Sequence, residues 1–330
     1  MGDMAEIEET AEHVAGWFHQ NYVIIGPTDD IIKRKYTVYS LYSFENPSEQ
    51  AYAYVPQPTA RRDHSELTMN ATLRVLLKVN GRSRHFPRLK HHGLIKKLVF
   101  GWDGDLEDER DPEWTSRPYI ILHHEHVMLS TLLAFSEKGT LPVDLALHAG
   151  LGIAYCLAAL HRAGFVHRLV SPHSFSYPVP LTLDLLSARM IITDMSLCHP
   201  YPTKPRASVP FMGCLRYSST RVHKQREQGP SDDYISLIYI IAEMISGKLP
   251  WRSVLEESQV HALKVEFWQS PEFKRLPKEL RKLYKKLVEM ASMTWIDASL
   301  VIDAFKEAIA RRDPNKAYEL PQWLVMPSAN

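Results

Sequence analysis

Apolar residues follow two different periods along this chain, and the change of period divides it into two regions. Up to residue 124, alternating polarity and short apolar runs predict strands at 22–25, 36–44, 50–55, 93–102 and 117–122. The break at 45–48, with the sequence Glu-Asn-Pro-Ser, predicts a hairpin turn. Helical spacing is confined there to 64–79 and to an amphipathic segment at 5–20.

The rest of the chain has the spacing of helices. Apolar faces with a helical period predict helices at 129–133, 143–163, 232–245, 260–267, 277–293 and 298–311. We therefore expect an N-terminal helical extension at 1–20, a strand-rich lobe at 21–124, a helical lobe at 125–312 and a tail at 313–330. Strands and helices segregated in this way predict an α+β fold of two lobes.

The composition narrows the class of protein. A length of 330 residues with 45% apolar content is ample for two packed lobes, and a formal charge of +1 favours neither nucleic acid nor membrane as a partner. Three cysteines, an odd number without a CxxC pair, indicate a reducing compartment. The acidic N-terminus does not resemble a secretory signal, and the apolar run 234–245 is too short to cross a bilayer. We expect a cytoplasmic or nuclear protein that is not secreted.

Two segments of the helical region carry a family pattern. Residues 165–175 read FVHRLVSPHSF, and 211–219 read FMGCLRYSS, followed by His223, Glu227, Gly229, Asp232-Asp233 and GKLPWR at 247–252. The second segment resembles the F-x-G-T-x-R-Y-x-S, E-x-G-R-x-D-D and G-x-L-P-W pattern of the casein kinase I superfamily, including its tau-tubulin kinase branch. Together the segments cover most of the helical lobe, whereas the strand-rich lobe matches only in outline. The resemblance implies a bilobal protein-kinase fold.

The same resemblance implies that the catalytic loop is degenerate. His167 and Arg168 match the first two residues of the kinase H-R-D, but Leu169 stands at the catalytic Asp. Ser171 replaces the lysine of the loop and Ser174 the metal-binding Asn. Because an isobutyl group cannot accept a proton, general-base catalysis from position 169 is absent.

The phosphate-binding positions of the strand-rich lobe are degenerate as well. Aligning 37–39 with the strand after the glycine-rich loop places Ile31, Lys33 and Tyr36 at its three glycines, where a Cβ hinders backbone contact with phosphate. The strand lysine falls on Val55 and its glutamate partner on Asn70. A lysine from the glycine-loop strand, Lys33 or Lys35, could substitute for the missing one, but it would not repair Leu169.

A few retained residues complete the implied site. Asp194, in Asp-Met-Ser at the place of D-F-G, is a weak candidate ligand for a divalent ion. Arg206, with Lys204 nearby, resembles the basic residue that binds an anion in the activation segment of casein kinase I, although an exposed Arg in a loop is the simpler interpretation. Asp233 is expected to brace the catalytic loop, and Gly213 and Arg216 to be structural.

These substitutions favour a pseudokinase that acts as a protein-binding or regulatory module. We expect no cofactor, or ATP with Mg²⁺ if nucleotide binding persists, and a protein partner whose identity the sequence does not state. The alternative is an active Ser/Thr kinase with non-standard residues. An unrelated structural protein would require the match at 211–252 to be accidental.

Overall fold

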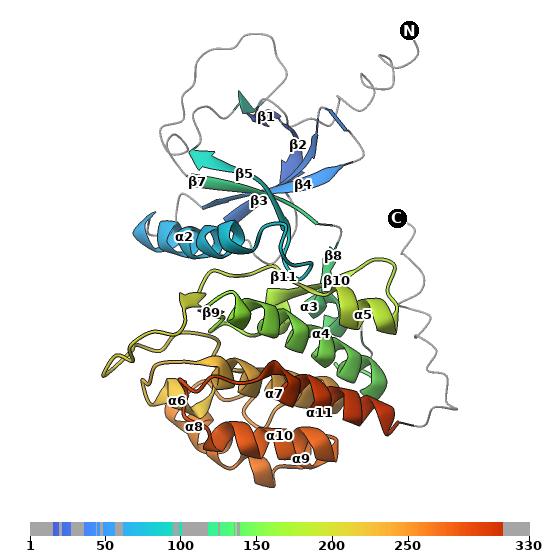
Figure 1. The fold of residues 1–330 in the computed structure, drawn as a ribbon, viewed down its shortest axis with the longest axis vertical. Helices are drawn as coiled ribbons and strands as arrows, with labels where there is room; N and C mark the ends of the chain where they lie inside the picture. The colour runs from blue at the N-terminus through green and yellow to red at the C-terminus, as the bar shows by residue number, and fades with distance from the viewer. Residues whose placement is uncertain are drawn as a thin grey trace. The chain divides into compact units, whose positions relative to one another are not determined.

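The computed structural model describes residues 16–19, 22–27, 36–43, 45–46, 49–56, 62–94, 99–100, 118–124, 126–134, 136 and 139–312. The chain divides into two compact units (Figure 1). The strand-rich unit comprises Met1–Gly81 and Pro87–Glu125, and the helical unit comprises Arg82–Phe86 and His126–Asn330. The chain thus changes unit three times, and residues 82–86 belong to the helical unit although the predicted lobes placed them with the strands.

The strand-rich unit is built on one antiparallel sheet. Its seven strands lie in the order β5-β7-β4-β3-β2-β1-β6. Their bounds are β1 Gly16–His19, β2 Tyr22–Pro27, β3 Tyr36–Ser43, β4 Gln50–Pro56, β5 Arg88–Leu94, β6 Val99–Phe100 and β7 Pro118–His123. The one helix described in this unit is α2, Arg62–Val79, which confirms the helix predicted at 64–79.

Alternate residues of the central strands form the core of this sheet. One buried cluster joins β3, β4 and β7. It consists of Tyr39 and Leu41 of β3, Ala51, Ala53 and Val55 of β4, and Tyr119 and Ile121 of β7. The period of two places these side chains on one face. α2 contributes a separate buried stripe with Met69, Val75, Leu76 and Val79 at helical spacing. The fold of this unit therefore follows from the pattern that predicted its strands.

Two predictions in the strand-rich unit are wrong in part. The helix predicted at 5–20 is a strand at its end, because Gly16–His19 form β1 and pair with β2. Residues 5–15 lie outside the described part. Backbone pairing with β2 and β6 outweighs the helical spacing of Trp17 and Phe18, since aromatic residues also suit strands. The range predicted as one strand, 93–102, contains the end of β5, which begins at Arg88 and pairs with β7, and a separate strand, β6, which pairs with β1.

The predicted hairpin turn at 45–48 joins β3 and β4, which pair from Tyr36↔Pro56 to Tyr42↔Gln50. Within it, the Asn46 carbonyl accepts a hydrogen bond of 2.9 Å from the Glu49 N–H. Pro47 and Ser48 lie outside the described residues.

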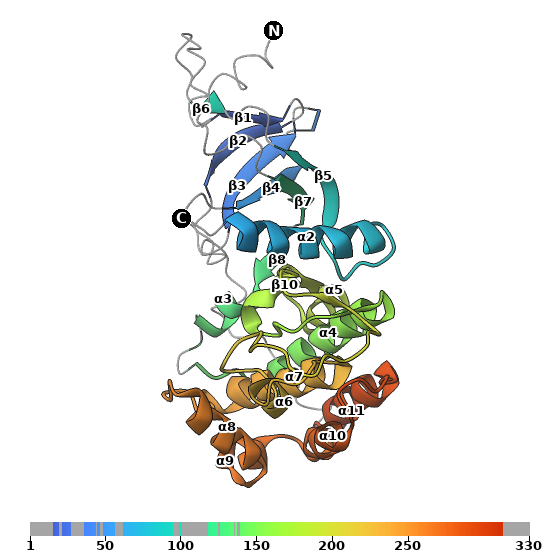
Figure 2. The same cartoon turned by 90° about the vertical axis from the view of Figure 1, so that its left-hand side faces the viewer.

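The helical unit contains the six predicted helices. They are α3 Leu129–Ala134, α4 Val143–Arg162, α7 Pro230–Ser246, α8 Glu257–Val265, α10 Lys278–Glu289 and α11 Ala298–Ala310 (Figure 2). The helix predicted at 277–293 ends at Glu289, because Met290 is extended. α4 is long and apolar enough to cross a membrane, but 72% of its most apolar window is buried inside the protein, as expected of a core helix.

Short elements of this unit escaped the periodicity analysis. They are α5 Leu183–Arg189, α6 Thr220–His223, α9 Pro271–Arg275, η2 Pro172–Ser174, η3 Phe267–Gln269, and the small sheets β11-β10-β8 and β12-β9. These sheets join β8 His126–Met128, β10 Phe175–Pro178 and β11 Ile191–Ile192, and β9 Phe165–Val166 with β12 His199–Pro200. Elements of two to seven residues are too short to display a period. They nonetheless fix the loop at 165–175, because β9 and β10 flank it.

Candidate functional site

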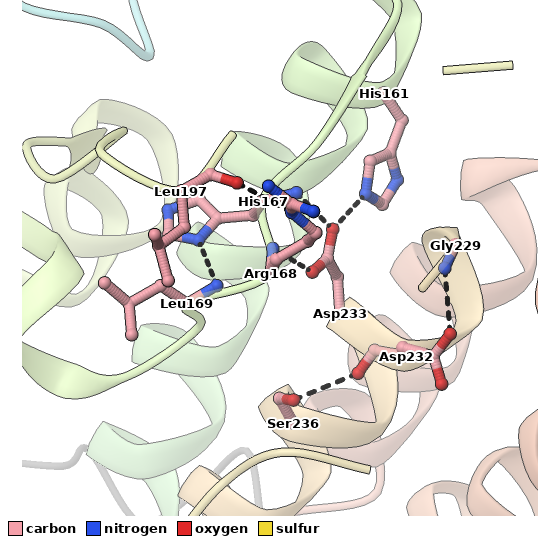
Figure 3. A network of polar contacts seen from close by, with 9 residues as sticks. All are labelled: His161, His167, Arg168, Leu169, Leu197, Gly229, Asp232, Asp233 and Ser236. Atoms are coloured by element: carbon pink, nitrogen blue, oxygen red, sulfur yellow. Dashed lines mark hydrogen bonds and ion pairs between the residues drawn. The ribbon is translucent and has the colours of Figure 1, made fainter. Parts of the chain in front are cut away.

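The loop between β9 and β10 is held by a single carboxylate. Asp233 Oδ2 accepts hydrogen bonds from the backbone N–H of His167 at 2.8 Å and from Nε2 of His161 at 2.8 Å. Its Oδ1 accepts from the backbone N–H of Arg168 at 2.9 Å (Figure 3). Arg168 has a positive φ of 64°, so the backbone turns sharply at the point where Asp233 grips it. The structure thus gives Asp233 the bracing contacts expected of it.

The first turn of α7 places Asp233 beside this loop. Asp232, one residue earlier, accepts hydrogen bonds from the backbone N–H of Gly229 at 2.8 Å and from the hydroxyl of Ser219 at 2.6 Å. Arg221 Nη1 lies 3.4 Å from Asp232 Oδ1 and also donates to the Ser231 hydroxyl at 2.7 Å. These contacts occupy the free donors at the helix start, where negative charge is favoured by the helix dipole.

The electrostatics of this bracket keep the carboxylate charged. Burial would raise the pKa of Asp233, but the hydrogen bond and charge of His161, and then the nearby ring and backbone N–H of His167, lower it below the ordinary value. Burial lowers the pKa of the His167 imidazole. Nδ1 of His167 in turn accepts the N–H of Leu169 at 3.1 Å (Figure 3). Three successive backbone N–H groups, at 167, 168 and 169, are therefore fixed by buried side chains.

The polar residues that follow are used inside the loop itself. The Ser174 hydroxyl donates to the Leu169 carbonyl at 2.6 Å and lies 3.1 Å from the Ser171 hydroxyl. Ser171 and Ser174 are both buried, and the Leu169 side chain is half-buried hydrocarbon. Nothing at positions 169, 171 or 174 presents a carboxylate, an amine or an amide to a substrate.

The Asp-Met-Ser segment contributes one carboxylate, that of Asp194. Asp194 Oδ1 accepts the backbone N–H of Ser196 at 2.9 Å, and Met195 is fully buried. Among the described residues, no group of three or more His, Cys, Asp or Glu side chains could hold a metal ion. Because Mg²⁺ takes near-octahedral oxygen ligands and usually more than one carboxylate or phosphate group, one self-bonded carboxylate beside two serines does not fit it.

Two of the phosphate-binding positions, Val55 and Tyr36, lie in the described part of the strand-rich unit, and neither carries a charge. Val55 is fully buried in the sheet core and pairs with Thr37. Tyr36 is 6% exposed and donates its hydroxyl to Thr68 Oγ1 on α2 at 2.8 Å. Ile31, Lys33 and Lys35 lie outside the described residues.

Asn70, the predicted position of the glutamate partner, lies on the exposed side of α2. Asn70 is exposed, whereas its neighbours Thr68 and Met69 are buried. On a helix, adjacent residues point about 100° apart, so the buried face of α2 excludes Asn70. Asn70 therefore does not lie on the buried face of α2, and its assignment to the glutamate position stays a prediction.

Arg206, the candidate anion-binding residue, forms an ion pair with another residue of the same chain. Arg206 forms a two-pronged ion pair with Glu227, with Nε to Oε2 at 2.7 Å and Nη2 to Oε1 at 2.9 Å. The hydrogen bond to Arg206 lowers the pKa of the buried Glu227. Arg168, for its part, donates from Nε to the Leu197 carbonyl at 2.8 Å. Nε and Nη2 of Arg206 are thus used by Glu227, although the Arg206 side chain is 50% exposed, and Lys204 is an exposed side chain nearby.

Gly213 and Arg216 have the structural roles that their sequence context implies. Gly213 adopts φ 133°, and a Cβ there would lie 2.8 Å from the Arg168 carbonyl. The Arg216 carbonyl accepts the indole N–H of Trp251 at 2.7 Å, and its guanidinium lies 3.6 Å from Glu243. The activation segment is therefore anchored both to the catalytic loop and to the segment after α7.

A buried lysine that the sequence analysis missed supports the same segment. Nζ of Lys264 donates to the carbonyls of Leu215 at 2.7 Å and Ser218 at 2.6 Å, and it lies 3.2 Å from Nε2 of His223. The rings of Tyr239 and Trp251 flank it at 5.6 and 5.4 Å. Helical spacing gave a usable signal, since Val260, Lys264 and Phe267 share one face of the predicted helix.

Comparison with known proteins places the chain among kinases. No protein-family model matches it. A Caenorhabditis elegans protein named as a candidate casein kinase I is 30% identical over 172 residues, which is 50% of this chain and 43% of that protein. The inactive tau-tubulin kinase ttbk-6 of the same species is 28% identical over 69% of this chain and 77% of its own length. The casein kinase 1-like protein HD16 of Oryza sativa subsp. japonica is 31% identical over 29% of this chain and 14% of its own.

The matched region spans less than half of the casein kinase I relatives' own length, so the similarity concerns a domain. The antiparallel sheet, the helical unit, and the Asp233 bracket around His167 and Arg168 agree with it. The chain contains a protein-kinase-like domain that is similar to casein kinase I and tau-tubulin kinase proteins.

Proposed function

We propose that this domain is a pseudokinase, a kinase fold that binds a protein partner or regulates it without transferring phosphate. The observation that carries the proposal is Leu169, set at the general-base position of a loop whose backbone is fully braced. Loss of a general base costs ~10²–10⁴ in rate. The missing lysine at Val55 and the missing amide at Ser174 would remove charge stabilisation and positioning in addition.

A relative adds support, because ttbk-6 is itself named inactive. The alternative is an active Ser/Thr kinase, which would use ATP and Mg²⁺ as kinase relatives do. Its support is the retained Asp194 together with the intact His167-Arg168 bracket. The pseudokinase reading is favoured because no described side chain takes the place of the catalytic carboxylate. We further propose a cytoplasmic or nuclear setting and a protein partner, in keeping with the near-neutral charge of +1.

Phosphate transfer from labelled ATP to casein and to the protein itself tests this proposal. We expect incorporation by the native chain to equal that of the Asp194→Ala variant, since neither holds a complete phosphate site. A parallel thermal-shift titration with ATP and Mg²⁺ should leave the unfolding midpoint unchanged. Incorporation well above background that disappears in Asp194→Ala would establish the active-kinase alternative.

A further inference from the structure

One face of α10 is a stripe of positive charge. Lys278, Lys282, Lys285 and Lys286 are all exposed, and at 100° per residue they fall within an arc of about 100°. We call these four lysines the basic stripe. The opposite face is buried and holds the helix against the rest of the unit through Leu280, Leu283, Tyr284 and Leu287. Two further exposed cations, Lys274 and Arg275, close the preceding helix α9 (Figure 2).

The stripe is not neutralised within the part of the chain that the structure describes. None of its four lysines forms an ion pair with a described residue, whereas Arg206, Arg311 and Arg312 elsewhere on the unit each pair with a carboxylate. The two acidic residues of α10 do not pair with the stripe. Glu279 is buried and pairs with Arg311 at 2.8 Å, and Glu289 is the single exposed acid of α10, at its C-terminal end.

The order of charges along α10 is unfavourable for the helix alone. Lys278 and Lys282, Lys282 and Lys286, and Arg281 and Lys285 are like charges four residues apart, a spacing that destabilises a helix. A surface helix ordinarily mixes both signs along such rows. Local choices that oppose the stability of an element are expected where a surface serves binding.

We propose that the basic stripe of α10 docks an acidic segment of a partner protein. The inference deepens the proposed binding function and rests on it only for the partner being a protein. From Lys278 to Lys286 the helix rises about 12 Å, the length of about four residues of extended chain. In an extended run of Asp and Glu residues, alternate carboxylates face one side, and these can lie along the four ammonium groups.

An acidic polypeptide fits this surface better than the other polyanions. Single-stranded nucleic acid is held by stacking on exposed aromatic rings. Phe273 and Tyr284, the aromatic residues of α9 and α10, are each 4% exposed, and the exposed Trp268 and Trp295 lie outside these two helices. Insertion into an anionic membrane needs exposed large apolar side chains on the same helix, and α9 and α10 expose none. The near-neutral total charge also gives no long-range field for a nucleic acid.

Fluorescence anisotropy with a labelled twelve-residue polyglutamate peptide tests the proposal on the full chain. The stripe variant is Lys278→Glu, Lys282→Glu and Lys285→Glu. Its control, Arg189→Glu, Arg226→Glu and Lys248→Glu, makes the same change in net charge at exposed positions away from α10. We expect the native chain to bind at low salt, the stripe variant to bind about tenfold more weakly, and the control to stay close to native.

No binding by the native chain, or equal weakening by both variants, overturns the inference. So does tighter, stripe-dependent binding of a uridine dodecamer or of phosphatidylserine vesicles, which would assign the stripe to nucleic acid or to membrane. If the glutamate variant unfolds at a lower temperature, the milder Lys278→Gln, Lys282→Gln and Lys285→Gln variant replaces it and should still lose several-fold. Phosphate transfer measured on the same preparation keeps a failure of the proposed function distinct from a failure of this surface.

Discussion

At the scale of single residues, the molecule keeps charges where they hold backbone and has none where a kinase needs them for chemistry. Asp233 and Lys264 are both buried and both bind main-chain groups. Asp233 accepts hydrogen bonds from the N–H groups of His167 and Arg168, and Lys264 donates to the carbonyl of Ser218. Position 169, by contrast, is hydrocarbon. The charged residues that remain in this region are therefore structural in their contacts.

Lys264 provides a residue-scale prediction. Burial lowers the pKa of Lys264 to about 7. Among the described residues, no carboxylate lies at hydrogen-bond distance to raise it again. The unfolded chain, with a lysine pKa near ~10.4, binds the extra proton between pH 7 and 10, so the free energy of unfolding should rise with pH across this window. The gain is on the order of a few kcal/mol over the full window.

Chemical denaturation between pH 7 and 9.5 measures this effect, with Lys264→Met as the matched variant. The variant lacks the titrating amine, so its slope with pH should be smaller than that of the native chain. The comparison cancels contributions from cysteines and tyrosines, which are common to both. Identical slopes would show that Lys264 keeps an ordinary pKa.

At the scale of elements, the start of α7 controls the site because Asp232 and Asp233 occupy its first turn. This start is packed against the segment before α11. A Cβ added at Gly229 would lie 1.6 Å from the Ser292 carbonyl oxygen, which is impossible without moving one of the two backbones. Glycine is therefore required there for close approach.

The Gly229→Ala variant should lose at least ~2 kcal/mol of unfolding free energy, because the backbone must shift to admit the methyl group. The readout is the denaturant midpoint followed by circular dichroism. Gly81→Ala serves as the comparison, since Gly81 has a positive φ of 70° but open space around it. Its cost should be about 1 kcal/mol, and a Gly229→Ala variant no less stable than Gly81→Ala would contradict the packing argument.

The elements also show what the sequence could and could not predict. Long periodic helices such as α4, α7 and α11 and the hairpin β3–β4 were predicted within a few residues. Gly16–His19 was misassigned, because strand pairing is decided by residues elsewhere in the chain. In the site, Asp233 followed from the family pattern, whereas the pairing of Arg206 with Glu227 across 21 positions left no local signal. The assignment of Asn70 rests on a looser alignment, because the strand-rich unit matches the family only in outline.

At the scale of the whole molecule, the two units share the chain unevenly. Residues 82–86 belong to the helical unit, and His85 shows why. Its Nδ1 lies 2.9 Å from the Met190 carbonyl, and its carbonyl accepts the N–H of Ile192 at 2.9 Å. The segment thus closes the edge next to β11.

His85 is one of several histidines held neutral, and together they predict acid sensitivity. Burial lowers the pKa of His85, His148, His167 and His173, and lowers that of His223 to about 3. Below pH 6.5 the unfolded chain takes up protons that the folded chain does not, so stability should fall as the pH drops from 6.5 to 5.

Thermal unfolding at pH 7.5, 6.5, 5.5 and 5 tests this. The midpoint should be nearly constant down to pH 6.5 and then decline, and the decline should be shallower in a His223→Gln variant. A midpoint that stays level to pH 5 would mean that these imidazoles are free to ionise in the folded state.

The grip of Asp233 on the catalytic loop has one more consequence. Asp233 accepts hydrogen bonds from backbone N–H groups, which every residue except proline has. The bend therefore does not depend on the side chain at position 169. The side chain at position 169 and the fold of the loop are therefore independent, so this side chain can change by mutation while the surrounding fold is kept. A protein with this loop can thus lose its general base and still keep the fold that a partner binds.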